Sequence, residues 1–458
     1  MPLIAAPRSR GCHCSRPSRW LAAMGCAVTA LASAGSLAVK IPDTPAAKAM
    51  DSWLAAFNSD DRERIDMFDK TYADWVPLEW ALNLRQSTGG LDLLRIEASR
   101  EREVIFRVQV GSGPDEFIGL IKVSTSQPPV ITNLGLYPVR PGSRFEDVQL
   151  NASARRIVIE SIARALNEAY VFPDTAKAMA AALQRAERRG AYKTLSDGQD
   201  FARQLTEDLR AVSNDKHLRV SFNLVGQPPG DVPAPSDTAA GRRQRLAADN
   251  CGFERAEHLA GNIGYLKFNE FADTDICAQT ASAAMTFLAN SDALVIDLRD
   301  NHGGRPEMVT FLASYLFEQR THLNDIYDRK TNATRQFWTE PEVSGRKFIG
   351  KPVYLLTSKS TFSAAEDFSY ALKMLKRATI IGEATGGGAH PVEPRSIDAH
   401  FSLVVPVSRS ISSISGKDWE GTGVEPDVKV PAAEALNEAI KIAGGGGGPQ
   451  GIAKTQDR

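Results

Sequence analysis

The stretches LVIDLRDNHGGRPEMV (residues 294–309) and VYLLTSKSTFSAAEDF (residues 353–368) determine the fold that we expect for this chain. Each begins with an apolar run that lacks polar alternation, as is typical of a strand with both faces covered by helices. Each then turns and opens a helix, because Pro306 suits a first helical position and Ser363 suits a helix start. These units predict an α/β sheet with both turns at its carboxyl edge, where such sheets bind ligands.

Three regions of regular structure are predicted along the chain. Strands and helices alternate through residues 251–435, which we interpret as an α/β core. Residues 148–225 have helical periodicity and end in a short strand that begins near His217, so they predict a helical subdomain. Residues 45–140 combine amphipathic helical segments with short alternating strands, which predicts a small α+β domain of cone-like type.

Two segments are predicted to lie outside these regions. Residues 226–250 begin with a run rich in Pro, Gly, Ala and Arg, which favours an exposed linker. Residues 444–458 begin with a run of glycines, and we expect this tail to be disordered.

The N-terminal residues 1–34 have the three-part pattern of a secretory signal. Four arginines precede the apolar run 20–32, and the small residues 32–34 offer a cleavage site. The run is short for a permanent membrane span. We therefore expect an exported chain, periplasmic or secreted, with no membrane span after the signal is removed; an uncleaved anchor is the alternative.

The charge and the cysteines constrain the partners and the compartment. The 54 Lys and Arg residues nearly balance the 55 Asp and Glu residues, with no basic block, so nucleic acid is not an expected partner. Cys251 and Cys277 remain after signal removal, and in an exported chain this even pair predicts a disulfide, with two buried free thiols as the alternative. No Cys and His spacing resembles a zinc site, and we predict neither a metal nor a cofactor.

Ser363 has two interpretations from the residues alone. The sequence from Ser363 to Glu366 has the form of a capping box. The free N–H groups of a helix start also stabilise an oxyanion, and Gly303 or Gly304 could bring a second N–H group beside that of Ala364. The two glycines could equally form only a tight turn, so neither signal decides by itself.

Three motifs resemble the tail-specific, or C-terminal processing, serine peptidase family. They are DLRDNHGG (297–304), STFSAAEDFSYALKMLKRATIIGEATGGG (360–388) and GTGVEPDV (421–428). The likeness covers roughly residues 148–435 and is strongest to the branch with the tricorn protease core and interphotoreceptor retinoid-binding protein. It implies a ClpP/crotonase-like α/β core, here preceded by the helical subdomain and the α+β N-terminal domain, and a serine-type peptidase that acts on polypeptides.

The resemblance assigns roles to particular residues. The nucleophile falls on Ser363, and the oxyanion hole falls on Gly303 or Gly304 together with the N–H of Ala364. In the tail-specific branch a Lys acts as the base, but the corresponding position here is Gly388. The Ser-Lys pair of that branch is therefore missing.

The tricorn-like branch instead implies a histidine base and an orienting carboxylate. These roles fall on His217 and Glu420, and this set can take and return the Ser363 proton. Lys216 stands where that branch has a Ser, so we expect Asp215, on the same face of the strand, to supply the missing orienting group.

The other histidines are ranked by their distance from the two Gly-rich junctions. His390 is the second candidate base and His302 the third, because each lies beside such a junction. The remaining ones are interpreted as structural: His258, His322 and His400.

The leading hypothesis is an exported serine peptidase with a polypeptide substrate. The alternative is a non-catalytic binder of an apolar ligand or peptide on the same fold, although retention of Ser363, His217 and Glu420 argues against it. A crotonase-like acyl-CoA enzyme is disfavoured by the export signal. No peptide-tethering domain of the PDZ type is visible, and the sequence does not predict the oligomeric state.

Overall fold

The computed structural model describes residues 39–59, 61–72, 81–82, 84–85, 88–111, 113–139, 143–146, 148–226 and 239–444. The predicted signal at 1–34 and residues 445–458 of the predicted tail lie outside the described residues. Within the described ranges, no helix has both the length and the apolar character needed to cross a membrane.

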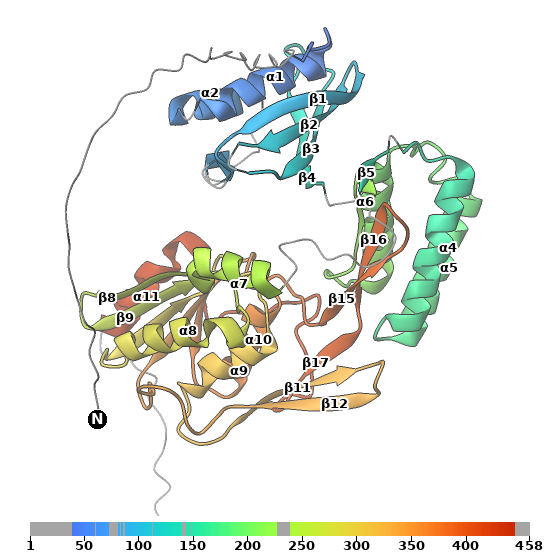
Figure 1. Cartoon of the computed structure of the whole chain (residues 1–458). Helices are drawn as coiled ribbons and strands as arrows, with labels where there is room; N and C mark the ends of the chain where they lie inside the picture. Colours follow the sequence, from blue (N-terminus) through green and yellow to red (C-terminus); the bar gives the residue numbers. More distant parts are fainter. Residues whose placement is uncertain are drawn as a thin grey trace, which may run out of the picture. The chain divides into compact units, whose positions relative to one another are not determined.

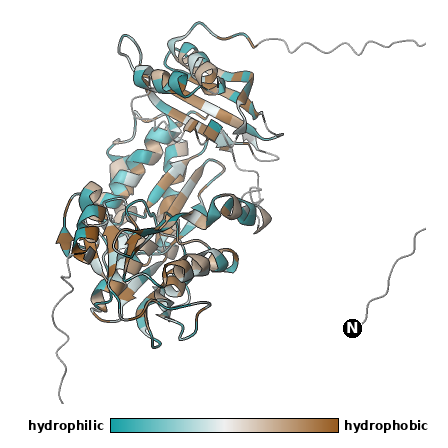
Figure 2. Cartoon of the chain, turned by 90° about the vertical axis from the view of Figure 1, so that its left-hand side faces the viewer, coloured by the Kyte–Doolittle hydropathy of each residue, from teal (hydrophilic) through white to brown (hydrophobic). Residues whose placement is uncertain are grey.

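Helices α1 and α2 and an antiparallel sheet belong to the part of the N-terminal α+β region that the structure describes (Figure 1). The helices are α1 (Pro45–Asn58) and α2 (Arg62–Tyr72), and the sheet has the order β1 (Leu91–Arg100), β2 (Glu103–Val110), β3 (Glu116–Val123) and β4 (Ile131–Pro138). Trp53 of α1 packs against Phe106 of β2, with ring centroids 6.2 Å apart. Figure 2 shows both hydrophobic and hydrophilic residues on the helices, as expected of helices with one buried face.

The helical region leads directly into the turn that carries His217. It contains α4 (Ala152–Ala169), α5 (Pro173–Arg188) and α6 (Gly198–Ser213), and α6 ends at Asn214 with the left-handed φ of 55°. The strand after the turn, β6 (Arg219–Phe222), pairs with β16 (Phe401–Pro406), which in turn pairs with β15 (Val392–Ser396). The chain around His217 is thus held by strands that lie about 180 residues further along the sequence.

The core is a six-stranded sheet with the order β18-β14-β13-β10-β9-β8. Its parallel strands are β9 (Ile263–Phe268), β10 (Ala293–Asp297), β13 (Val353–Thr357), β14 (Thr379–Gly382) and β18 (Val428–Lys429), whereas β8 (Phe253–Leu259) is antiparallel to β9. The predicted α/β core is therefore confirmed. β10 and β13 are direct neighbours, so the two turns that follow them lie at the same edge of the sheet.

Helices cover both faces of this sheet. Leu294 and Ile296 of β10 pack with residues of α8 (Thr274–Leu288), α9 (Pro306–Ser314) and α10 (Ala364–Met374). The alternate residues Ala293 and Val295 pack with α11 (Ala435–Gly444) on the other face. This explains the apolar runs without alternation that the sequence shows.

The prediction of a linker over residues 226–250 was wrong for its second half. Helix α7 (Ala239–Ala248) occupies that part, and Leu246, 1% exposed, packs into the same cluster as α8 and α9. Alanine and arginine are strong helix formers, and one apolar residue is enough to dock so short a helix.

A second unpredicted feature is the antiparallel sheet of β12 (Ala333–Trp338), β11 (His322–Asp328) and β17 (Ser408–Ser412).

Cys251 and Cys277 are joined in a disulfide, with the sulfur atoms 2.06 Å apart. The bond links the chain just before β8 to the first turn of α8, and both residues are buried.

Candidate active site

Hydrogen bonds join the two strand-to-helix turns at the carboxyl edge of the sheet. The Phe362 N–H donates to the Asn301 carbonyl at 3.1 Å, and Thr361 Oγ1 donates to the Leu298 carbonyl at 2.8 Å. The buried Asn301 side chain holds its own turn, since its Oδ1 accepts the Gly303 N–H at 2.9 Å. The start of α10 is therefore fixed against the glycine turn before α9.

Ser363 is the N-cap of α10 and has an unusual backbone. The predicted capping box is present, and the Glu366 carboxylate accepts the Ser363 N–H at 2.8 Å. An ordinary N-cap lies in the extended region, whereas Ser363 has φ 56° and ψ −120°. Such a conformation costs about 1–3 kcal/mol in a residue with a side chain, and it resembles the strained strand-to-helix turn that exposes a nucleophile.

Two of the three predicted oxyanion donors are available. The N–H groups of Gly304 and Ala364 have no acceptor among the described residues, whereas the Gly303 N–H already donates to Asn301. A β-carbon on Gly304, which has φ 142°, would lie 2.2 Å from the Phe271 carbonyl oxygen. The close approach of the backbone therefore requires glycine at that position.

A cavity of about 420 Å³ brings several of the predicted residues together, although Glu420 and Gly303 are not among those that line it. Its lining includes Ser363, His217, Gly304, Ala364 and Gly388.

His217 lies in the turn before β6 and is half-buried. Its ring packs against that of Phe362, with centroids 4.6 Å apart. Burial lowers the pKa of His217 to about 4, so the imidazole is neutral at neutral pH and can accept a proton. Its Nδ1 is buried and has no hydrogen-bond partner among the described residues.

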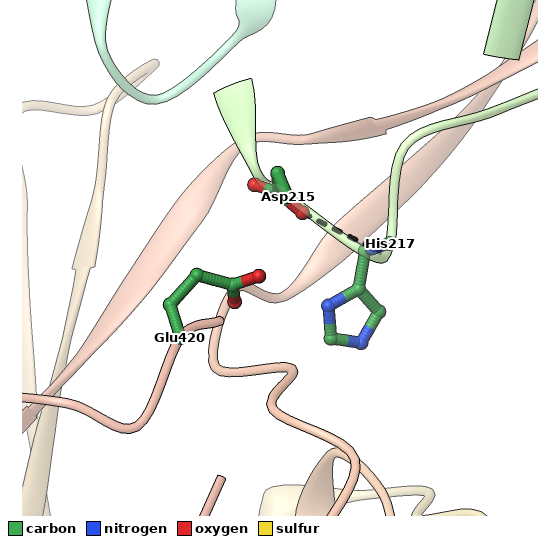
Figure 3. Close-up of side chains that lie close together, drawn as sticks. All are labelled: Asp215, His217 and Glu420. Atoms are coloured by element: carbon green, nitrogen blue, oxygen red, sulfur yellow. Dashed lines mark hydrogen bonds between the residues drawn. The ribbon is translucent and has the colours of Figure 1, made fainter. Parts of the chain in front are cut away.

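Glu420 faces this ring (Figure 3). Its Oε1 accepts the Lys216 N–H at 3.3 Å and its Oε2 accepts the Ala389 N–H at 2.5 Å, so two backbone groups hold the carboxylate in place. Burial raises the pKa of Glu420 to about 7, and the nearby Asp215 carboxylate adds to that effect.

Asp215 makes no hydrogen bond to the His217 ring, although its charge opposes the lowering of the His217 pKa. It lies in the turn rather than on a strand, and its Oδ1 accepts the backbone N–H of His217 at 3.1 Å (Figure 3). Its Oδ2 binds Nδ1 of His390 at 2.6 Å and accepts the Tyr170 hydroxyl at 3.1 Å. The left-handed end of α6 at Asn214 turns the chain before β6 begins, which is why strand alternation does not apply here.

Two family models match this chain. Residues 262–430 match the model of peptidase family S41, and residues 148–247 match the N-terminal domain of peptidase S41 in eukaryotic IRBP. The chain belongs to peptidase family S41.

Individual relatives are distant and much longer than the matched part. The carboxyl-terminal-processing peptidase 2, chloroplastic, of Arabidopsis thaliana is 30% identical over 186 residues, which cover 38% of this chain and 33% of the relative. The carboxy-terminal processing protease CtpA of Bacillus subtilis is 24% identical, over 38% of this chain and 36% of the relative. The tricorn protease of Thermoplasma volcanium is 28% identical, over 31% of this chain and 13% of the relative. This chain thus spans about a third or less of the length of these relatives.

The other candidate bases of this S41 chain do not line the cavity. His390 is 4% exposed and paired with Asp215. His302 is exposed, and its Nδ1 lies 3.2 Å from the Ser360 carbonyl oxygen. The three histidines interpreted as structural each contact a polar partner: His258 with Ser291, His322 with Asp325 and His400 with Asn223.

Glu366 makes more hydrogen bonds in the S41 site than the capping-box pattern predicts. It is fully buried, and besides the Ser363 N–H it accepts the Thr385 hydroxyl at 2.5 Å and the N–H groups of Gly387 and Gly388 at 2.6 and 2.8 Å. Burial raises the pKa of Glu366, although these hydrogen bonds oppose the effect. The capping-box pattern named this residue, but contacts that lie 19–22 residues away leave no local signal.

Asp215, His217 and Glu420 are also the residues that could hold a metal ion, because each offers a ligand atom within 4.8 Å of the others. Both carboxylates, however, already accept hydrogen bonds from the protein on each of their oxygens. An ion bound here would also occupy the imidazole that the predicted role of His217 as a base requires.

Proposed function

We propose that this chain is an exported serine peptidase in which Ser363, His217 and Glu420 cleave a peptide bond. Ser363 Oγ bonds to the carbonyl carbon, its proton passes to His217, and the N–H groups of Gly304 and Ala364 stabilise the oxyanion. Collapse breaks the C–N bond, and His217 returns the proton to the leaving amine. Water then attacks the acyl-enzyme with the same base, which releases the acid and restores Ser363.

The observation that carries this proposal is the space around Gly388. A β-carbon there would lie 2.6 Å from Cε1 of His217 and 2.2 Å from the Phe362 ring, so these two rings fill the volume that any side chain at this position would need. The resemblance assigns the family's Lys base to this position. The rings of His217 and Phe362 therefore leave no room for a Lys at position 388. This supports His217 as the base in place of that Lys.

Glu420 supplies the negative charge that a protonated His217 needs. When His217 takes the proton, the buried imidazolium needs a negative partner, and the Glu420 carboxylate is held on the same side by two backbone N–H groups. The unpartnered Nδ1 is the atom that a small ring movement would bring to Glu420, which leaves Nε2 for the serine proton.

Export is proposed on two grounds. Residues 1–34 have the pattern of a secretory signal. The disulfide between Cys251 and Cys277 suits an oxidising compartment. Fractionation of cells that express the full chain should place it outside the cytoplasm, and a fully cytoplasmic, uncleaved chain would contradict this part of the proposal.

The mechanism is tested with a fluorophosphonate probe and with hydrolysis of an unfolded protein substrate such as casein. The wild-type chain should be labelled at Ser363, Ser363→Ala should show neither labelling nor turnover, and His217→Ala should lose roughly 10²–10⁴-fold in rate. His302→Ala, which changes an exposed histidine outside the cavity, should keep full activity. Full activity in His217→Ala would overturn the assigned base, and a wild-type chain without labelling or turnover would favour a non-catalytic binder.

A further inference from the structure

Asp367 is a buried carboxylate in the wall of the cavity that the peptidase mechanism does not use. It is 6% exposed and lines the cavity together with Ser363, which lies one helical turn earlier on α10. One of its oxygens, Oδ1, accepts the Asn324 side-chain amide at 2.7 Å. Within the described ranges, no Lys, Arg or His forms an ion pair with it.

The other acids in the cavity wall differ in this respect. Glu270 lies 3.4 Å from Arg245, and Asp273 lies 3.7 Å from Arg242. Their charges are balanced within the protein and are partly exposed to solvent. Asp367 alone among these three is buried beside the nucleophile without a cation.

The strands opposite α10 give the space around Asp367 its shape. Asn324 and Ile326 lie two residues apart on β11 and therefore on the same face of that strand. Ser410 of β17 is the direct partner of Ile326, and both of these residues line the cavity. Asp367, the apolar Ile326 and the small Ser410 thus line the same cavity. We call the part of the cavity lined by these three residues the Asp367 subsite.

We propose that the Asp367 subsite binds a cationic side chain, Lys or Arg, of the residue whose carbonyl Ser363 attacks. The proposal rests on the proposed peptidase function, because it names the substrate class for that same site. The aliphatic part of a Lys or Arg side chain would pack along Ile326, and its charged end would meet the carboxylate. A buried carboxylate is costly without a partner, so a substrate that brings its own cation gains selectivity over one that does not.

The protonation of Asp367 agrees with this assignment. Burial raises its pKa to about 7, while the Asn324 amide has a smaller opposite effect. An empty site therefore leaves the carboxyl close to its point of ionisation, and a nearby cation favours the charged form.

The first test compares turnover of peptides that differ only at the residue before the cleaved bond. The wild-type chain should cleave a peptide with Lys or Arg there roughly tenfold or more faster, in kcat/KM, than one with Leu. Asp367→Asn, which keeps the size of the side chain, should remove this preference by lowering kcat/KM for the Lys and Arg peptides roughly tenfold or more. The matched control is Glu270→Gln, which alters an acid of the same cavity and should keep the preference.

The second test measures binding and needs no turnover. Benzamidine, an arginine-like cation, should bind Ser363→Ala in calorimetry and should compete with Lys peptides on the wild-type chain. The double variant Ser363→Ala/Asp367→Asn should bind it roughly tenfold or more weakly. If Asp367→Asn does not fold, the competition between benzamidine and Lys peptides on the wild-type chain still tests the Asp367 subsite.

The outcomes separate the two proposals. Turnover without a Lys or Arg preference, together with no effect of benzamidine, would overturn the Asp367 subsite and leave the peptidase proposal standing. Benzamidine binding that depends on Asp367 in a chain without any turnover would support the subsite and contradict the peptidase proposal.

Discussion

His390 Nδ1 lies 2.6 Å from Asp215 Oδ2, and the two side chains are 4% and 0% exposed. Neither residue lines the cavity, although His390 Nδ1 also lies 3.4 Å from Oε2 of Glu420. Asp215 also accepts the backbone N–H of His217, and the Tyr170 hydroxyl donates to the same oxygen that binds His390. The pair therefore fixes the turn from which His217 reaches the cavity, and it links that turn to the loop after Gly388.

The first prediction concerns the stability that this pair provides. Asp215→Ala removes the acceptor of the buried Tyr170 hydroxyl and leaves His390 only its longer contact of 3.4 Å to Glu420, and we expect a loss of about 3–5 kcal/mol in the free energy of unfolding. Urea denaturation followed by circular dichroism measures it. Asp418→Ala is the control: its carboxylate lies 3.9 Å from His390 Nε2 and is partly exposed, so its loss should stay below about 1 kcal/mol. Equal losses in the two variants would show that the buried pair is unimportant for folding.

The second prediction concerns the pH dependence of kcat/KM. Glu420 has a pKa of about 7, raised by burial, and only its charged form stabilises a protonated His217. His217 has a lowered pKa of about 4 and stays neutral across the range in which Glu420 ionises. We therefore expect kcat/KM to rise as the pH increases through about 7 and to level off above it.

Glu420→Gln provides the check on this assignment. The variant keeps the shape of the side chain but cannot ionise, so it should be slower by roughly 10²-fold and should lose the rise near neutral pH. A Glu420→Gln enzyme with the same pH profile as the wild type would assign the rise to another group.

The sequence predicted the parts of the fold that local patterns determine. The apolar strands β10 and β13, the glycine turn and the start of α10 at Ser363 each have short-range signals, and all were found. The sheets β12-β11-β17 and β15-β16-β6 were missed because each contains strands that are far apart in the sequence, and no local pattern shows which strands pair. Helix α7 was missed because the Pro- and Gly-rich residues before it dominate the composition of the segment.

The candidate site was predictable only in part for the same reason. His217 and Glu420 were found through the family resemblance, since nothing in their own surroundings marks them. The pairing of Asp215 with His390 spans 175 residues and occupies Nδ1 of His390, which no local pattern indicates. Burial, and with it the shift of each pKa, follows from packing that the sequence does not show.

The third prediction tests the space between Gly388 and His217. Gly388→Ala adds a β-carbon that collides with the rings of Phe362 and His217, so we expect a loss of about 1–3 kcal/mol in the free energy of unfolding. We also expect kcat to fall by a larger factor than KM changes. The control is Gly113→Ala, where a β-carbon meets nothing within 4 Å. Thermal unfolding and steady-state kinetics measure both variants. A fully active Gly388→Ala enzyme would mean that His217 can move freely and need not stand where the structure places it.

The fourth prediction concerns the disulfide. Cys251 and Cys277 are 26 residues apart, and a cross-link of that span stabilises a fold by about 3.5 kcal/mol in the loop-entropy model. Reduction with dithiothreitol should therefore lower the melting temperature of the wild-type chain. The double variant Cys251→Ala/Cys277→Ala should melt at a lower temperature and should not respond to the reductant. A reductant response in that double variant would trace the effect to something other than this bond.

The fifth prediction concerns metal removal. Asp215, His217 and Glu420 lie close enough to bind an ion, but the oxygens of both carboxylates already accept hydrogen bonds that hold the turn and the loop in place. A bound ion would occupy His217, the base that the mechanism needs. Dialysis against a chelator should therefore leave probe labelling of Ser363 and peptide turnover unchanged. Activity that disappears on dialysis and returns with zinc would instead assign these three residues to a metal centre and would exclude His217 as a free base.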